Sequence, residues 1–320
     1  MGELSIEITR KCANHCLHCS SKSSNMCTEQ IPKEIIFEII DRAENIHMDV
    51  LNISGGEPML HPDILDIIKY ADKKNMRINV YTSGVCLDEY GKPCPIPEMF
   101  LQESGYVRFV FNLPAVDNDV YNQFTETRGH LKIVKESINN VTMSSNYAYA
   151  SIHFVPTKIN ISQICKVLQF AESVGIREVK FLGLVLQGRA CQNKDELMLD
   201  QYSMDRIKKI LSLWSQSSDK INIGTPLQFD GCGRCNAGVG KLIVCYDGKV
   251  HGCDAYKGME CIHHNDHVYR PDSVYEKNIE DIFLGSEFLA EEERYAASIK
   301  NKAKNKSIVC PIQALQNGKP

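Results

Sequence analysis

Three cysteines near the start of the chain are close enough in sequence to serve one metal centre. They stand in the segment Cys12-Ala-Asn-His-Cys16-Leu-His-Cys19, with three residues and then two between them. Three thiolates from one short loop can hold three irons of a [4Fe-4S] cluster and leave the fourth iron open to an external ligand. A structural zinc site would instead close its shell with a fourth cysteine or histidine. The candidates for that fourth ligand are Cys27, His15 and His18.

A glycine-rich segment is the second motif. The apolar run Val50–Ser54 leads directly into Gly55, Gly56, Glu57 and Pro58. Glycines allow a ligand to approach the backbone closely and leave carbonyls exposed, while a carboxylate can receive an ammonium group. In isolation, such a segment could be an ordinary turn. One strand and one helix after the cysteines, it favours a ligand site beside the metal centre.

Short β-rich runs alternate with amphipathic helical patterns as far as about residue 190, and these elements must position both motifs. Six such units in succession imply right-handed parallel β-α-β connections and an open or partial barrel. Ligands of such sheets gather at the carboxyl ends of the strands, where both motifs stand. The expected strands are Leu4–Ile8, Val50–Ser54, Ile78–Thr82, Val107–Asn112, Ala148–Val155 and Glu178–Val185. Helical stripes follow Pro32 and Pro62 and begin again at Ile164.

The pattern changes after residue 195. A helix near Asp200–Ser215 precedes a cysteine-rich stretch, and Asp247-Gly248 is typical of a two-residue hairpin turn. Another helix is expected near Asn278–Ala297. Gly188-Arg189, after the sixth strand, could bind an anionic substrate group or simply end the strand.

Composition excludes several classes of protein. The net charge of −4 with 24% charged residues gives no overall attraction to nucleic acid or to a membrane surface. No apolar run approaches the roughly 20 residues of a bilayer span, and the first residues do not resemble a signal peptide. We therefore expect a cytoplasmic protein. Its 14 cysteines then point to metal or iron-sulfur ligation rather than to disulfides.

The cysteine spacing, its position after the first strand and the glycine segment together resemble the radical S-adenosylmethionine (SAM) superfamily. The resemblance implies an α/β fold, a partial (β/α)6 TIM barrel over residues 1–195, with Cys12, Cys16 and Cys19 holding the cluster. In the family, the segment that matches Gly55, Gly56, Glu57 and Pro58 binds the amino group of SAM. One electron from the cluster cleaves SAM to methionine and a 5′-deoxyadenosyl radical, which abstracts a substrate hydrogen atom.

Further SAM contacts follow from the same resemblance. Thr82 and Ser83 end the third strand, where the family often has a polar turn near SAM. Asn112 ends the fourth strand in place of the serine or aspartate pair that many relatives carry. Arg128 matches an arginine that contacts the SAM carboxylate in some peptide-modifying relatives, and a solvated surface arginine is the alternative.

The second region, residues 196–320, resembles the auxiliary-cluster domains called SPASM or Twitch, a small β-hairpin and α-helical unit. Cys235, Gly248 and Cys253 fit the opening of such a domain. The seven-cysteine arrangement of two clusters is absent, which favours one auxiliary [4Fe-4S] cluster, and zinc is the alternative. The expected ligands are Cys232, Cys235, Cys253 and Cys310, with Cys245 and Cys261 in reserve.

Among relatives, such a region is common in enzymes that modify ribosomally synthesised peptides or protein side chains, which is the leading hypothesis. The early position of Cys12 leads us to expect that a leader peptide docks directly or through a separate binding protein. A reduced flavodoxin- or ferredoxin-type protein is the expected electron donor. The alternative is a small-molecule dehydrogenase or cofactor-biosynthesis enzyme, although the chain end Asn317–Pro320 lacks the terminal Gly-Gly of the molybdopterin-pathway cyclase.

Overall fold

The main sheet is curved and almost entirely parallel. The computed structural model describes residues 2–144, 149–225 and 240–302, and within them this sheet has nine strands in the order β11-β10-β1-β2-β3-β6-β7-β8-β9. Neighbours from β10 to β9 run parallel, and β11 pairs antiparallel with β10. The strands are β1 (Gly2–Thr9), β2 (Met48–Gly55), β3 (Arg77–Thr82), β6 (Val107–Asn112), β7 (Tyr149–Phe154), β8 (Glu178–Phe181), β9 (Asn222–Gly224), β10 (Lys241–Val244) and β11 (Val250–His251).

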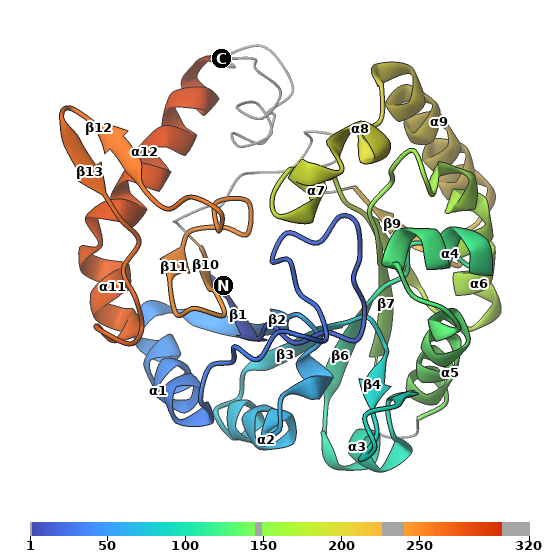
Figure 1. Cartoon of the computed structure of the whole chain (residues 1–320), viewed down its shortest axis with the longest axis horizontal. Helices are drawn as coiled ribbons and strands as arrows, with labels where there is room; N and C mark the ends of the chain where they lie inside the picture. The colour runs from blue at the N-terminus through green and yellow to red at the C-terminus, as the bar shows by residue number, and fades with distance from the viewer. Residues whose placement is uncertain (1, 145–148, 226–239, 303–320) are drawn as a thin grey trace.

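The helices lie around the outside of this sheet, and the loop that follows β1 lies near the centre of the molecule (Figure 1). The edge strands β11 and β9 do not pair with each other in the part of the chain described, so the barrel is open. The sequence prediction of a partial barrel is confirmed. The helices are α1 (Lys33–Ala43), α2 (Ile64–Lys73), α3 (Glu98–Glu103), α4 (Asn118–Thr125), α5 (His130–Met143), α6 (Ile164–Ser173), α7 (Arg189–Gln192), α8 (Lys194–Leu197), α9 (Gln201–Ser217), α11 (Ile279–Gly285) and α12 (Glu287–Lys302).

The two faces of the sheet differ in chemistry because side chains alternate along a strand. In β1, Leu4, Ile6 and Ile8 are fully buried in the core that the helices cover. The intervening Ser5 and Glu7 are buried polar residues on the inner face. The barrel therefore has an apolar outer layer that supplies stability and a polar interior that is available for chemistry.

The second region contributes to the same sheet. The hairpin at Asp247-Gly248 forms, but its turn has three residues rather than the predicted two. The Cys245 N–H donates to the Lys249 carbonyl and the Gly248 N–H donates to the Cys245 carbonyl, each over 2.8 Å, and Gly248 has φ +83°. Its first strand, β10, pairs with β1, and β9 extends the opposite edge beside β8. The boundary at residue 195 stays a prediction, because the barrel sheet takes strands from both sides of it.

Two expectations about the later elements need correction. The helix expected over Asn278–Ala297 is two helices, α11 and α12, because Ser286 between them has an extended backbone. The strand expected to reach Val185 ends at Phe181.

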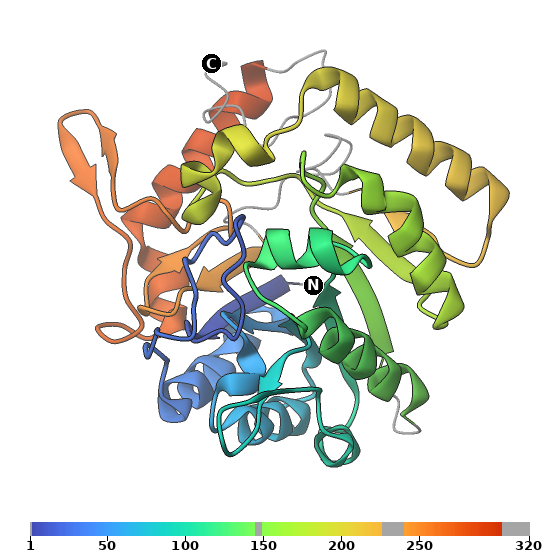
Figure 2. The same cartoon turned by 45° about the vertical axis from the view of Figure 1, so that its right-hand side comes forward.

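Two small hairpins were not expected: β4 (Cys86–Leu87) with β5 (Pro93–Cys94), and β12 (Ile262–His264) with β13 (His267–Tyr269). The second of these projects from the fold in both views (Figure 2). None of the described helices has the length and hydropathy of a membrane span.

Candidate active site

The three cysteines lie together in the loop that follows β1. Cys12 is 7% exposed, and Cys16 and Cys19 are partly exposed. All three are free thiols. Backbone N–H groups already point at two of the sulfurs, from Asn14 to Cys12 Sγ and from Ser23 to Cys19 Sγ, each over 3.4 Å. Such N–H groups stabilise thiolates, as metal coordination requires.

The electrostatics of this loop suit a metal centre. Burial, together with the neighbouring Cys16 and Glu57, raises the pKa of Cys12, and burial with the neighbouring Cys19 raises the pKa of Cys16 to about 12. Several thiolates therefore cannot coexist here without a compensating positive charge. Bound iron supplies that charge and deprotonates the thiols that coordinate it.

The number and kind of the donors bear on the two metal centres that the sequence left open. In the described residues no group of three or more Cys, His, Asp or Glu side chains converges on one ion position. Zinc ligands must all lie within about 2.0–2.3 Å of a single point. Cluster thiolates bind different irons, so they stand further apart. Three cysteines from one loop are the donor set of a [4Fe-4S] cluster, which needs three protein ligands at three different irons.

The segment Gly55–Pro58 packs against the start of the cysteine loop. The Gly56 N–H donates to the Thr9 carbonyl over 2.7 Å, and the Glu57 N–H donates to the Lys11 carbonyl over 2.8 Å. A Cβ on Gly55 would lie 2.2 Å from the Thr9 carbonyl oxygen, and one on Gly56 would lie 2.2 Å from that of Lys11. Only glycine fits in either position. The two motifs that stand 36 residues apart in the sequence (Cys19 and Gly55) are thus one structural unit.

Glu57 organises the end of β3. Its side chain is fully buried, and Oε1 accepts from the Thr82 hydroxyl over 2.7 Å and from the Met59 N–H over 3.2 Å. Oε2 accepts from the Ser83 N–H over 2.7 Å and from the Ser83 hydroxyl over 2.6 Å. Burial raises the pKa of Glu57, although these hydrogen bonds act to lower it. Both oxygens are engaged by protein donors, whereas the sequence suggested a contact with an ammonium group.

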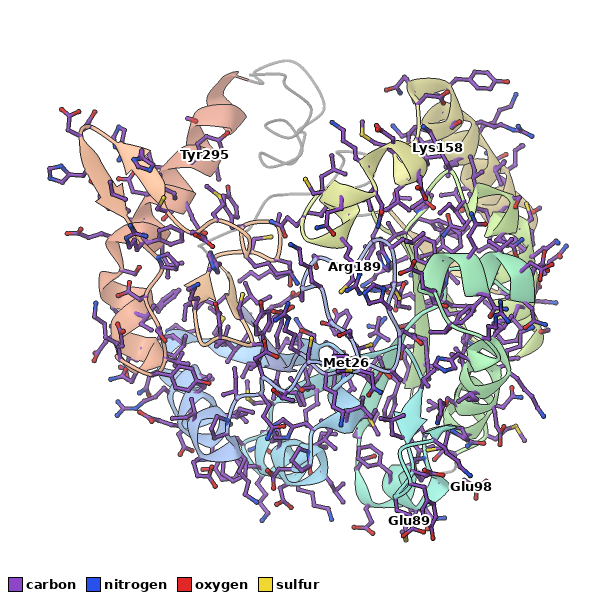
Figure 3. All side chains as sticks on the ribbon, viewed as in Figure 1. Met26, Glu89, Glu98, Lys158, Arg189 and Tyr295 are labelled. Carbon is purple, nitrogen blue, oxygen red and sulfur yellow. The ribbon has the colours of Figure 1, made fainter. Side chains whose placement is uncertain are left out.

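Arg189 holds the cysteine loop from the opposite side of the barrel mouth. It is 7% exposed, and its Nε donates to the Cys16 carbonyl over 2.9 Å and its Nη2 to the Ser23 carbonyl over 2.7 Å. Its own N–H donates to the Cys19 carbonyl over 2.9 Å. Figure 3 shows Arg189 in the middle of the molecule, beside the loop that carries Met26. The sequence suggested a substrate contact or the end of a strand, so this role was missed.

Neighbouring elements secure the rest of the loop. The Asn193 side chain donates to the Leu17 carbonyl over 3.0 Å, and the Leu17 N–H donates to the Phe124 carbonyl at the end of α4. His18 packs on Phe124 with ring centroids 4.7 Å apart. Asn112, an expected SAM contact, lies 3.5 Å from His18 Nε2. Asn112 therefore stands at the cysteine loop, and Arg128 is exposed beyond α4.

A buried ion pair joins the second region to the cysteine loop. Lys257 Nζ lies 2.7 Å from Glu7 Oε1 and donates to the Ser21 hydroxyl over 2.9 Å. The Ser21 hydroxyl also donates to Glu7 Oε1 over 2.6 Å. The side chain of Glu7 is 3% exposed and that of Lys257 is 12% exposed. The segment after the hairpin is thereby fixed against the end of β1.

The second cysteine group is only partly described. Cys232, Cys235 and Cys310 lie outside the described residues. Cys253 is partly exposed just after β11, and the reserve ligand Cys245 is buried. The other reserve ligand, Cys261, lies with its sulfur 3.4 Å from His263 Nε2 on the projecting hairpin. The expected auxiliary ligand set stays a prediction.

An open parallel barrel with a three-cysteine loop bonded to a glycine segment at its mouth defines a class of iron-sulfur enzyme. Residues 6–186 match the sequence profile of the radical SAM superfamily. The chain belongs to the radical SAM superfamily, whose enzymes bind a [4Fe-4S] cluster and SAM.

Relatives of known activity fall into different substrate classes. The chain is 22% identical to the mycofactocin maturase MftC of Mycolicibacterium smegmatis over 78% of this chain and 63% of that protein, so it spans less than two thirds of that relative. It is 23% identical to the GTP 3′,8-cyclase of Alkaliphilus oremlandii over 91% of this chain and 90% of that protein.

Solved structures share the fold over nearly the whole chain. The SAM-bound structure of SuiB from Streptococcus suis matches with a TM-score of 0.76 and 16% identity, over 99% of this chain and 75% of that one. SuiB bound to its precursor peptide SuiA matches with a TM-score of 0.74 and 15% identity, over 99% of this chain and 73% of that one.

Proposed function

We propose that this enzyme modifies a ribosomally synthesised peptide or a protein side chain by hydrogen abstraction. The observation that carries the proposal is the fold match to SuiB, which extends beyond the barrel to 99% of this chain and includes a structure with a bound precursor peptide. The similarity to a mycofactocin maturase supports the same substrate class.

In this proposal Cys12, Cys16 and Cys19 hold the [4Fe-4S] cluster, which when bound supplies the electron that cleaves SAM. The backbone of Gly55 and Gly56 lies beside the loop and would receive the amino group of SAM through its carbonyls. Ser83, Thr82 and Asn112 line the same mouth of the barrel and remain the candidate contacts to the rest of SAM.

The chain's own residues determine where the chemistry happens. Arg189 fixes the loop by its carbonyls, so the sulfurs keep a constant position relative to the strand ends. The Glu57 carboxylate holds the Ser83 backbone and hydroxyl against the glycine segment. Rigid support of this kind keeps reacting groups in register and limits the entry of water.

We also propose that the second region binds one auxiliary [4Fe-4S] cluster through Cys232, Cys235, Cys253 and Cys310. Its support is the hairpin that precedes Cys253 and the Lys257–Glu7 pair, through which the segment after the hairpin contacts the end of β1. Iron content separates the two centres: the Cys253→Ala variant should lose iron from one centre, and a triple alanine variant of Cys12, Cys16 and Cys19 should retain the auxiliary iron.

The test is anaerobic reconstitution with iron and sulfide, reduction, and incubation with SAM and peptides encoded beside the gene. We expect 5′-deoxyadenosine together with a mass change on a peptide, and neither product from the triple alanine variant. Formation of 5′-deoxyadenosine with no change in any peptide would contradict the peptide proposal and leave the enzyme class intact.

The second candidate is a GTP cyclase. The similarity to the GTP 3′,8-cyclase covers 91% of this chain and 90% of that protein, a fuller match than that to the maturase. The same reconstituted enzyme is therefore incubated with GTP in place of peptides. Consumption of GTP that depends on SAM and reductant would favour the cyclase over the peptide enzyme.

A further inference from the structure

A cavity of about 430 Å³ lies inside the barrel toward the amino-terminal ends of its strands, away from the cysteine loop. Side chains from six strands line it, from β1 through β8. Its size falls within the range of small-ligand pockets. The lining is polar, because the inward positions of these strands carry charged and amide side chains. Among the lining residues are Asn52, Asn79, Tyr81, Arg108, His153 and Lys180.

In the wall of this cavity, the carboxylate of Glu178 forms ion pairs with two cations. Glu178 Oε2 pairs with the Arg108 guanidinium, and Glu178 Oε1 lies 3.1 Å from Lys180 Nζ. The side chain of Glu178 is 15% exposed, whereas those of Arg108 and Lys180 are 27% and 38% exposed. Both cations therefore reach the cavity, and one negative charge cannot neutralise two positive ones.

The remaining charges nearby do not reverse this balance. Lys241 on β10 pairs with Asp254 over 2.5 Å, so these two charges cancel. Arg77 and Glu3 at the start of their strands also line the cavity and carry opposite signs. Burial, with the cations Lys180, Arg108 and Lys241, lowers the pKa of His153 to about 3. His153 is thus neutral and adds no charge to the cavity.

We infer that this cavity binds a carboxylate of the substrate between Arg108 and Lys180. A carboxylate is favoured because the planar guanidinium pairs with it through two N–H groups and the ammonium adds a point charge. The inference rests on the proposed function, since it names the part of the substrate peptide that enters the barrel. An acidic side chain and a free carboxyl terminus are the two possible sources.

The test is equilibrium dialysis of radiolabelled probes against the reconstituted, oxidised enzyme with saturating SAM, which blocks the SAM carboxylate site and prevents turnover. N-acetyl-aspartate N-methylamide represents an acidic side chain, N-acetyl-alanine represents a carboxyl terminus, and N-acetyl-asparagine N-methylamide is the neutral isostere. We expect one carboxylate probe to bind at least tenfold more tightly than the neutral isostere, and Lys180→Met to remove most of that difference.

Glu178→Gln provides a test that damage to the fold cannot imitate. Removing the shared carboxylate leaves two cations for the ligand, so this variant should bind the carboxylate probe several-fold more tightly than the wild-type enzyme. Lys166→Met, which changes an exposed lysine on α6, should leave binding unchanged.

Equal binding of charged and neutral probes, or weaker carboxylate binding by Glu178→Gln, would overturn the inference. Because dialysis detects binding without turnover, its failure is distinct from a failure of the peptide-modification assay.

Discussion

Replacing Arg189 by methionine tests how the cysteine loop is held. Methionine keeps the apolar length of the side chain and removes two charge-assisted hydrogen bonds, to the carbonyls of Cys16 and Ser23. Bonds to a charged donor are worth about 1.5–3 kcal/mol each, which places the loss of the two bonds at about 3–6 kcal/mol. This loss is a large part of the free energy of unfolding of a typical domain, which is about 5–15 kcal/mol. We expect a lower denaturation midpoint of the apoprotein and less iron bound after reconstitution.

The control is Arg206→Met, because Arg206 is exposed on α9. Denaturant titration measures the stability of both apoproteins, and iron analysis with electron paramagnetic resonance of the reduced protein measures the cluster. Arg189→Lys restores the positive charge, but an ammonium group cannot reproduce both guanidinium hydrogen bonds. This variant should therefore recover only part of the lost stability and iron content. The reasoning is refuted if Arg189→Met matches Arg206→Met in both stability and iron content.

Two further variants test the other contacts of the loop. Gly56→Ala would place a Cβ 2.2 Å from the Lys11 carbonyl oxygen, so we expect about 1–3 kcal/mol of destabilisation and weaker SAM binding by dialysis, whereas Gly285→Ala, with no atom within 4 Å, should change neither. Lys257→Met leaves the Glu7 carboxylate buried without its cation and should cost about 3–5 kcal/mol in denaturant titrations, and adding Glu7→Gln should recover most of it; equal losses in the single and double variants would show that the charge is not the cause.

Local patterns in the sequence were sufficient to predict the six strands β1, β2, β3, β6, β7 and β8, but not the short edge strand β9. The strand over Val107–Asn112 has the predicted bounds, and the observed β1 and β2 extend the predicted strands by a few residues. The helix that follows Pro32 begins at Lys33. These elements were predictable because their apolar positions follow the periods of a strand or helix, and burial of the apolar face stabilises both.

Contacts between distant segments were not predictable in this way. Nothing near Arg189 indicates that its guanidinium meets carbonyls about 170 residues earlier in the chain, and Lys257 meets Glu7 across 250 residues. The same limit applies to Glu57, whose motif was recognised but whose donors come from the end of β3. The sequence identified the residues of the cysteine loop, whereas only the fold reveals what holds that loop in place.

The way in which the loop is held has a consequence for its sequence. The side chains of Arg189 and Asn193 bind it through backbone carbonyls, and the Glu57 N–H does the same at Lys11. A carbonyl is present whatever side chain a residue carries, so these contacts constrain the path of the loop rather than its composition. The cysteines must be in place for the metal, and Asn14, Leu17 and His18 between them make side-chain contacts of their own with His130 and Phe124 or with neighbouring apolar residues. The residues that fix the path of the loop therefore lie outside it, just after β2 (Glu57) and in and just after α7 (Arg189 and Asn193).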